Sequence, residues 1–200
     1  MLDRGRERLQ TVLVSRAPVI FLVRHAHSDY SPDEMRDLSL PGRAAAEQVA
    51  DVLAGRGISR IISSPYTRAR QTVEPLARRL DLEIEREPDL RERKLTDGPT
   101  AGDFREYLAA TWRDFNLAYP GGETSSEAQI RVSRAIGRIA ASNGGRNVVI
   151  ASHGNALALF LHTLDPTVDF DFWMRMSLPD VYALDVDAAP WSFERVWQPV

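Results

Sequence analysis

Three apolar runs of this sequence are each followed by side chains suited to phosphate chemistry. These side chains are Arg24 and His25, then Arg68, and then His153. Arginine guanidinium groups bind phosphate oxygens through paired hydrogen bonds, and a histidine whose tautomer is fixed can attack phosphorus. If the residues meet in the folded chain, they form an anion pocket that contains a nucleophile. Gly154 would let the backbone approach such an anion closely at the start of a helix, where N–H groups also favour negative charge.

The elements that must position these residues alternate along the chain. The apolar runs at 19–23, 58–62 and 147–151 are rich in β-branched residues and predict strands buried on both faces. Further strands are expected at 82–85, 180–185 and 192–197, the last two as a closing pair. Helices are expected at 43–54, 66–80, 103–116, 125–142 and 156–164. This alternation predicts an α/β fold, a three-layer α/β/α sandwich with a mostly parallel central sheet, in which ligands bind at the carboxyl ends of the strands.

Length and composition exclude several classes of protein. A chain of 200 residues with 44% hydrophobic and 26% charged residues fits one ordinary globular domain. We expect that domain at residues 17–200, after an arginine-rich N-terminal extension at residues 1–16. The absence of cysteine excludes disulfides, thiolate metal sites and a cysteine nucleophile. The net charge of −3 argues against nucleic acid as a partner, and no apolar run is long enough for a membrane span. A cytoplasmic location follows as the expectation, and the oligomeric state stays open.

Short motifs in a fixed order give a more specific indication. They are Arg24-His25-Ala26, Leu38-Ser-x-x-Gly42, Ser63-Ser-Pro-x-x-Arg68-Ala-x-Gln-Thr72, Leu90-Arg-Glu92, Gly121-Gly-Glu123 and Ser152-His153-Gly154. In order and spacing they resemble the histidine phosphatase superfamily, the group that contains cofactor-dependent phosphoglycerate mutases. The resemblance covers roughly residues 19–184. One departure is Ala26, where the family usually has glycine.

The resemblance implies a role for each matching residue. His25 would be the nucleophile that takes the phosphoryl group, while Arg24, Arg68 and His153 would hold its oxygens. Glu92 would protonate the leaving oxygen and then activate water. Asp29, Asp89 and Glu123 are competing acids that spacing alone does not exclude. Additional phosphate contacts are expected from Ser28, Gly154 and Asn155. The implied fold is phosphoglycerate mutase-like, the substrate is a phosphorylated small molecule, and no metal or other cofactor is expected.

Other functions stay open from sequence. Within the family we expect a phosphatase, because the segment 94–119 is short for a lid that would exclude water; a phosphoglycerate mutase-type phosphoryl transfer is the alternative. His25, His27 and Asp29 also fit the start of a metal-dependent hydrolase motif. A non-catalytic module that binds a phosphorylated ligand is a further alternative. The acidic residues Asp165, Asp169 and Asp171 are expected to form a solvated loop rather than a metal site.

Overall fold

The computed structural model describes residues 18–31, 33–97 and 104–198. The predicted N-terminal extension, residues 1–16, lies outside the described residues. In the part of the chain that is described, no helix has the length and apolar character needed to cross a membrane.

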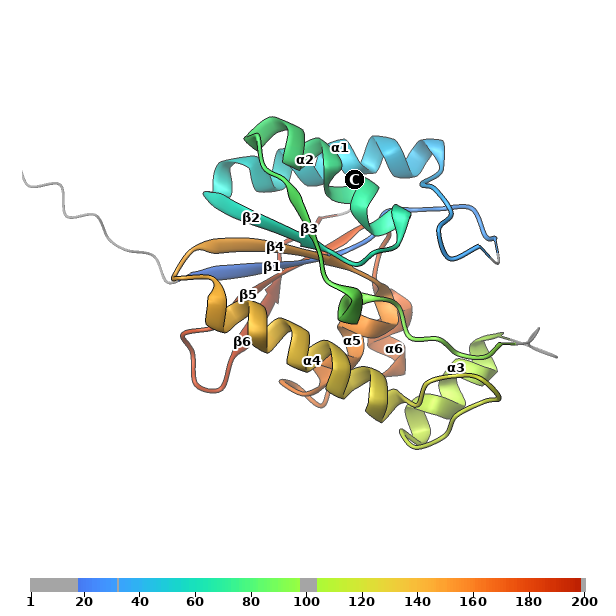
Figure 1. Cartoon of the computed structure of the whole chain (residues 1–200). Helices are drawn as coiled ribbons and strands as arrows, with labels where there is room; N and C mark the ends of the chain where they lie inside the picture. Colours follow the sequence, from blue (N-terminus) through green and yellow to red (C-terminus); the bar gives the residue numbers. More distant parts are fainter. Residues whose placement is uncertain (1–17, 32, 98–103, 199–200) are drawn as a thin grey trace, which may run out of the picture.

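A six-stranded sheet forms the middle layer, in the order β3-β2-β4-β1-β5-β6 (Figure 1). Its strands are β1 (Val19–Arg24), β2 (Ile58–Ser63), β3 (Ile84–Arg86), β4 (Asn147–Ser152), β5 (Asp180–Asp185) and β6 (Ser192–Arg195). The strands from β3 to β1 are parallel, whereas β5 and β6 continue the sheet in antiparallel fashion. The predicted mostly parallel sheet and the predicted closing pair are therefore confirmed.

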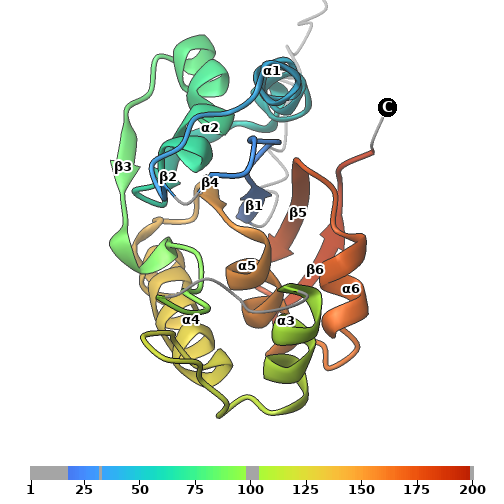
Figure 2. The ribbon, with the colours of Figure 1, turned by 90° about the vertical axis from the view of Figure 1, so that its right-hand side faces the viewer.

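Helices cover both faces of this sheet, which confirms the three-layer sandwich (Figure 2). The first face carries α1 (Leu40–Leu53) and α2 (Thr67–Leu80), with the short 3-10 turn η1 (Ala54–Arg56) after α1. On the other side lie η2 (Pro88–Leu90), α3 (Phe104–Arg113), α4 (Ser125–Ser142), α5 (Gly154–His162) and α6 (Phe170–Arg175).

Alternation along the central strands explains why both layers of helices are held. In β1, Ile20 and Leu22 pack into the core on the α4 and α5 side, whereas Phe21 and Val23 pack on the α1 and α2 side. Successive side chains of a strand point to opposite faces, so an unbroken apolar run supplies both cores. Every residue of α5 from Gly154 to Leu161 is buried, and all of them except Asn155 are apolar or glycine, as expected for a helix packed on all sides.

Local capping fixes where some helices begin. Thr124 caps α4 through a reciprocal pair of contacts with Glu127, as its sequence pattern predicts. Asp169 accepts from the backbone N–H of Phe172 and caps α6. The expectation of an acidic loop is therefore wrong for Asp171, which lies in α6, whereas Asp165 and Asp169 lie outside the helix. A helix shorter than two turns leaves no periodic pattern to detect.

Candidate active site

His25 and His153 lie next to each other at the carboxyl end of the sheet. Arg24 of β1 is paired with Ser152 of β4, so the histidine that follows each residue leaves the sheet at the same level. The backbone N–H of His25 donates to the carbonyl of Ser152 (3.0 Å), and the imidazole centroids are 5.2 Å apart. His153 is fully buried and His25 is 9% exposed. The predicted meeting of the two histidines is therefore present in the structure.

Hydrogen bonds fix the tautomer of His25. Its Nδ1 lies 2.7 Å from the carbonyl oxygen of Ala26, which can only accept, so Nδ1 carries the proton. Nε2 accepts from Nε of Arg68 at 3.2 Å and therefore holds the lone pair. Burial, reinforced by the charge of Arg68, lowers the pKa of His25 from 6.5 to about 3. The imidazole is consequently neutral near pH 7, with a lone pair directed at a cationic environment.

His153 is held by a hydroxyl and has one ring nitrogen available. Its Nε2 lies 2.8 Å from Oγ of Ser64, which also accepts from the backbone N–H of Tyr66. Among the described residues, its buried Nδ1 has no hydrogen-bond partner. Burial, and next the neighbouring His25, lowers the pKa of His153 well below 6.5. A bound oxyanion would supply the partner that Nδ1 lacks.

Two arginines, Arg68 buried and Arg24 partly buried, lie beside the two histidines. Nη1 of Arg24 donates to the carbonyl of Met176 (2.8 Å), while its buried Nε has no partner in the described part of the chain. Nη1 of Arg68 donates to the carbonyl of Glu34 (2.8 Å). Burial lowers the pKa of Arg24 and, with the charge of Arg36 as the next cause, the pKa of Arg68 to about 10. These groups remain cationic near neutral pH and face two neutral imidazoles, which is a suitable arrangement for a dianion.

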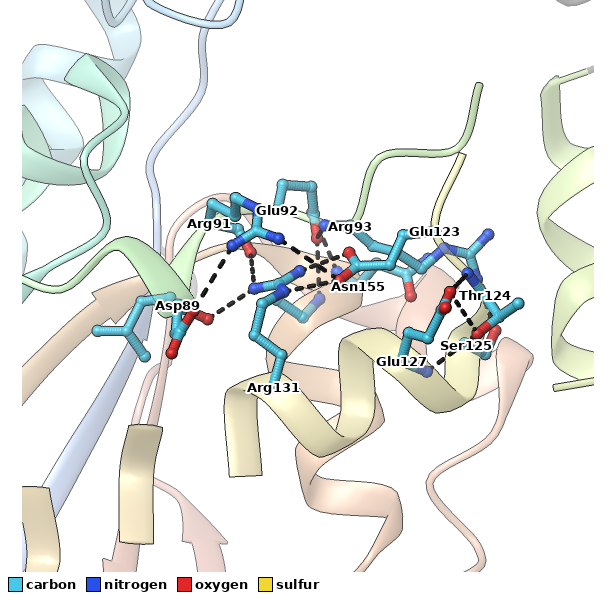
Figure 3. Close-up of polar contacts among 12 residues, drawn as sticks. Asp89, Arg91, Glu92, Arg93, Glu123, Thr124, Ser125, Glu127, Arg131 and Asn155 are labelled. Carbon is cyan, nitrogen blue, oxygen red and sulfur yellow. Dashed lines mark hydrogen bonds and ion pairs between the residues drawn. The ribbon is translucent and has the colours of Figure 1, made fainter. Parts of the chain in front are cut away.

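Glu92 reaches this pocket from the segment after η2. Its Oε1 accepts from the backbone N–H of Arg93 (2.9 Å) and of Ala156 (2.9 Å), and its Oε2 accepts from the N–H of Asn155 (3.2 Å; Figure 3). The carboxylate thus occupies N–H groups in the first turn of α5. The sequence predicts that N–H groups at this helix start favour a bound anion, whereas in the structure the Glu92 side chain accepts from them.

The three weaker candidates have different surroundings. Gly154 lies against Arg24: a Cβ at this position would be 2.8 Å from the guanidinium carbon, so glycine lets that arginine approach the helix. Asn155 is buried, and its Oδ1 has no partner among the described residues. Ser28 accepts from Nε of Arg36 (3.0 Å). A direct phosphate contact by any of the three stays a prediction.

Arg36, Ser64 and Thr72 are site residues whose contribution was not anticipated. The charge of Arg36 is among the causes that lower the pKa values of His25, His153 and Arg68, so Arg36 lies near these three groups, and its Nε donates to Ser28. Oγ1 of Thr72 accepts from the backbone N–H of Ala26 (2.9 Å) and fixes the turn after His25. Ser64 and Thr72 lie inside the motif that runs from Ser63 to Thr72, and this motif is the sequence signal for their place in the site. Arg36 lies in an irregular loop, and no sequence pattern indicates its position.

The alternative metal motif is not assembled. His27 is exposed, and its Nδ1 lies 2.8 Å from Oγ of Ser39, whereas His25 is buried. His162 is the last residue of α5, and its Nδ1 lies 2.8 Å from the carbonyl oxygen of Val168. Within residues 18–31, 33–97 and 104–198, no group of three or more histidine and carboxylate side chains is arranged to hold a metal ion.

Known proteins with the same features give the family context. A family model described as the histidine phosphatase superfamily (branch 1) matches residues 20–198. A 2,3-bisphosphoglycerate-dependent phosphoglycerate mutase of Methylobacterium radiotolerans is 29% identical over 201 residues, covering 84% of this chain and 91% of that protein. An uncharacterized protein of Mycobacterium tuberculosis is 36% identical over 124 residues, which are 58% of this chain and 60% of that relative's length.

Solved structures show the same fold. A mycobacterial glucosyl-3-phosphoglycerate phosphatase in complex with VO3 superposes with a TM-score of 0.74 at 24% identity, covering 92% of this chain and 100% of that one. YhfR of Bacillus stearothermophilus superposes with a TM-score of 0.71 at 22% identity, covering 91% of this chain and 96% of that one. The phosphoglycerate mutase-like architecture expected from the motifs is therefore confirmed.

Proposed function

Because this chain belongs to the histidine phosphatase superfamily, we propose that it hydrolyses a phosphomonoester through a phosphohistidine on His25, without a metal ion. The observation that carries the proposal is the state of His25: a neutral imidazole whose Nδ1 proton is held by the carbonyl of Ala26 and whose Nε2 lone pair lies beside Arg68. A nucleophile needs that lone pair, and an oxyanion needs the cation beside it.

The first step would transfer the phosphoryl group to the enzyme. Nε2 of His25 attacks phosphorus as the bond to the leaving oxygen breaks, and Glu92 in its protonated form gives its proton to that oxygen. Arg24, Arg68 and Nδ1 of His153 would hold the remaining phosphate oxygens as charge moves onto them. In the second step, the Glu92 carboxylate takes a proton from water, the water oxygen bonds to phosphorus, and the P–N bond breaks to release phosphate.

The substrate we infer is a phosphorylated small molecule. The segment from Lys94 to Tyr119 contains only α3 among its described residues, which is short for a closing lid, and this favours transfer of the phosphoryl group to water. Phosphoglycerate mutase activity is the second candidate, since Asn155 follows His153-Gly154 as in mutase-like members and the relative from Methylobacterium radiotolerans carries that name. The two differ with 3-phosphoglycerate: isomerisation that needs 2,3-bisphosphoglycerate and outpaces phosphate release would establish the mutase.

The acid role of Glu92 is tested with two leaving groups. Glu92→Gln should lower kcat/KM for an alkyl phosphate by roughly 100-fold or more, the range of general acid catalysis. The comparison uses kcat/KM because this constant reports the first step and not the hydrolysis of the phosphohistidine, which both esters share. p-Nitrophenyl phosphate should lose much less, because its leaving group hardly needs a proton. His25→Ala should abolish both activities and the acid-labile, base-stable label that trapping leaves on the wild type. Equal losses on both esters in Glu92→Gln would assign the proton to another residue, and an unlabelled active enzyme would exclude the phosphohistidine.

A further inference from the structure

We infer that Arg131 of α4 is a positioning residue for Glu92, an inference that rests on the proposed acid/base role of that carboxylate. Nη1 of Arg131 donates to the carbonyl oxygens of Asp89 (2.6 Å) and Arg91 (3.1 Å), the residues just before Glu92 (Figure 3). Its Nε and Nη2 donate to the two carboxylate oxygens of Glu123 at 2.7 and 2.6 Å. The guanidinium therefore joins two backbone carbonyls to one acidic side chain.

The segment that carries Glu92 needs this support because it lies outside helices and strands. After η2 ends at Leu90, the backbone from Arg91 to Leu95 belongs to no regular element, so its carbonyl groups make no helix or sheet hydrogen bonds. The carbonyl of Leu90 accepts from Oγ of Ser152 (2.7 Å). Consecutive carbonyls on the approach to Glu92 are therefore held by side chains of β4 and α4.

Glu123 holds the other side of the same segment. Its backbone N–H donates to the carbonyl of Lys94 (2.8 Å), two residues beyond Glu92. The side chains of Arg131 and Glu123 are 10% and 16% exposed, so water screens their ion pair little. A two-pronged arginine–carboxylate contact also fixes orientation. The pair thus clamps the backbone before and after Glu92, while the N–H groups of α5 hold its carboxylate.

Arg138 offers a matched control on the same helix. Its Nη2 pairs with the carboxylates of Glu87 (3.2 Å) and Asp89 (3.0 Å), but its side chain is 54% exposed. It therefore contacts the same stretch of chain from a solvent-exposed position, through side-chain carboxylates and not through backbone carbonyls. If these arginines acted only through their charge or through general stability, replacing either one should change activity in a similar way. If Arg131 positions Glu92, only the replacement of Arg131 should change activity.

The test compares leaving groups and uses a double-mutant cycle. Arg131→Met should lower kcat/KM for an alkyl phosphate by roughly 10- to 100-fold, as expected for a catalytic group misplaced in the first step. The kcat/KM for p-nitrophenyl phosphate should fall far less, which also reports that the surroundings of His25 are intact. In the Glu92→Gln background, Arg131→Met should add little further loss on either ester. Arg131→Lys, which can still reach a carbonyl, should recover part of the lost kcat/KM, and Arg138→Met should match the wild type.

Glu123→Gln provides a second variant that keeps the side-chain shape if Arg131→Met folds poorly. It should show the same dependence on the leaving group at smaller amplitude. The inference is overturned if the Glu123→Gln losses are equal on both esters, or if Arg131→Met lowers the activity of Glu92→Gln as much as that of the wild type. The proposed function has its own criterion, the Glu92→Gln single variant: if that variant lacks leaving-group dependence, the acid role itself is wrong.

Discussion

The neutral, buried state of His25 predicts a loss of folding stability in mild acid. Burial, and next the charge of Arg68, lowers the pKa of His25 from 6.5 to about 3. The unfolded chain therefore binds a proton on this imidazole below pH 6.5, while the folded protein does so only near pH 3. A group whose pKa is lowered by folding contributes stability that is fully present above its unfolded pKa and is lost as the pH falls toward its folded pKa.

The size of this loss follows from the two pKa values. Between them, each pH unit removes about 1.4 kcal/mol of the free energy of unfolding. At about pH 5 the contribution of His25 is lower by about 2 kcal/mol than at neutral pH. The pKa of His153 is also lowered by burial, so His153 acts in the same direction over this range. Against a typical total of about 5–15 kcal/mol, the effect is easily measured.

Urea unfolding at about pH 7.5 and about pH 5 separates the His25 contribution from all others. The wild type should lose about 2 kcal/mol more than His25→Gln between these conditions, because every other titrating group is common to both proteins. His27→Gln is the matched control for removing a histidine, since its side chain is exposed. An equal acid-induced loss in the wild type and in His25→Gln would refute a depressed pKa at this nucleophile.

Three further results are expected. Gly154→Ala would place a Cβ 2.8 Å from the Arg24 guanidinium carbon. This substitution should weaken inhibition by orthovanadate roughly tenfold, which is equivalent to about 1.4 kcal/mol. Unchanged inhibition would show that this contact does not affect anion binding. Thr72→Val leaves the buried N–H of Ala26 without its acceptor and should lower the urea-unfolding free energy by about 1–3 kcal/mol. EDTA should leave phosphate release unchanged, whereas a loss restored by zinc would support the metal-dependent alternative.

Much of the site could be predicted because its main residues follow buried strands. The apolar runs of β1, β2 and β4 identify parallel strands, and the carboxyl ends of such strands share one edge. His25 and His153 are the first residues after β1 and β4, so the prediction that they meet needed no knowledge of loops. The position of Arg68 could be predicted for a related reason, since this residue lies in the first turn of the helix after β2.

The contacts that sequence could not supply are those made to backbone atoms and across irregular segments. Arg131 binds carbonyl groups, which every residue has, so no residue pattern indicates its partners. Arg36 approaches the pocket through a loop without periodicity. Helix α6 is too short to show a helical period, and its cap at Asp169 resembles an ordinary acidic loop residue in sequence.

The position of Glu92 at α5 explains how one pocket can serve an anion and an acid together. A helix N-terminus favours negative charge, and in many proteins it binds the phosphate itself. Here the N–H groups of Asn155 and Ala156 donate to Glu92 instead. In the proposed mechanism the phosphate would therefore depend on the arginines and on Nδ1 of His153, which has no hydrogen-bond partner among the described residues. This division keeps the carboxylate fixed beside Arg24, whose close approach depends on Gly154. Because the phosphate has partners other than these N–H groups, the clamp formed by Arg131 and Glu123 has to hold only the acid, and its loss should leave turnover of p-nitrophenyl phosphate largely intact.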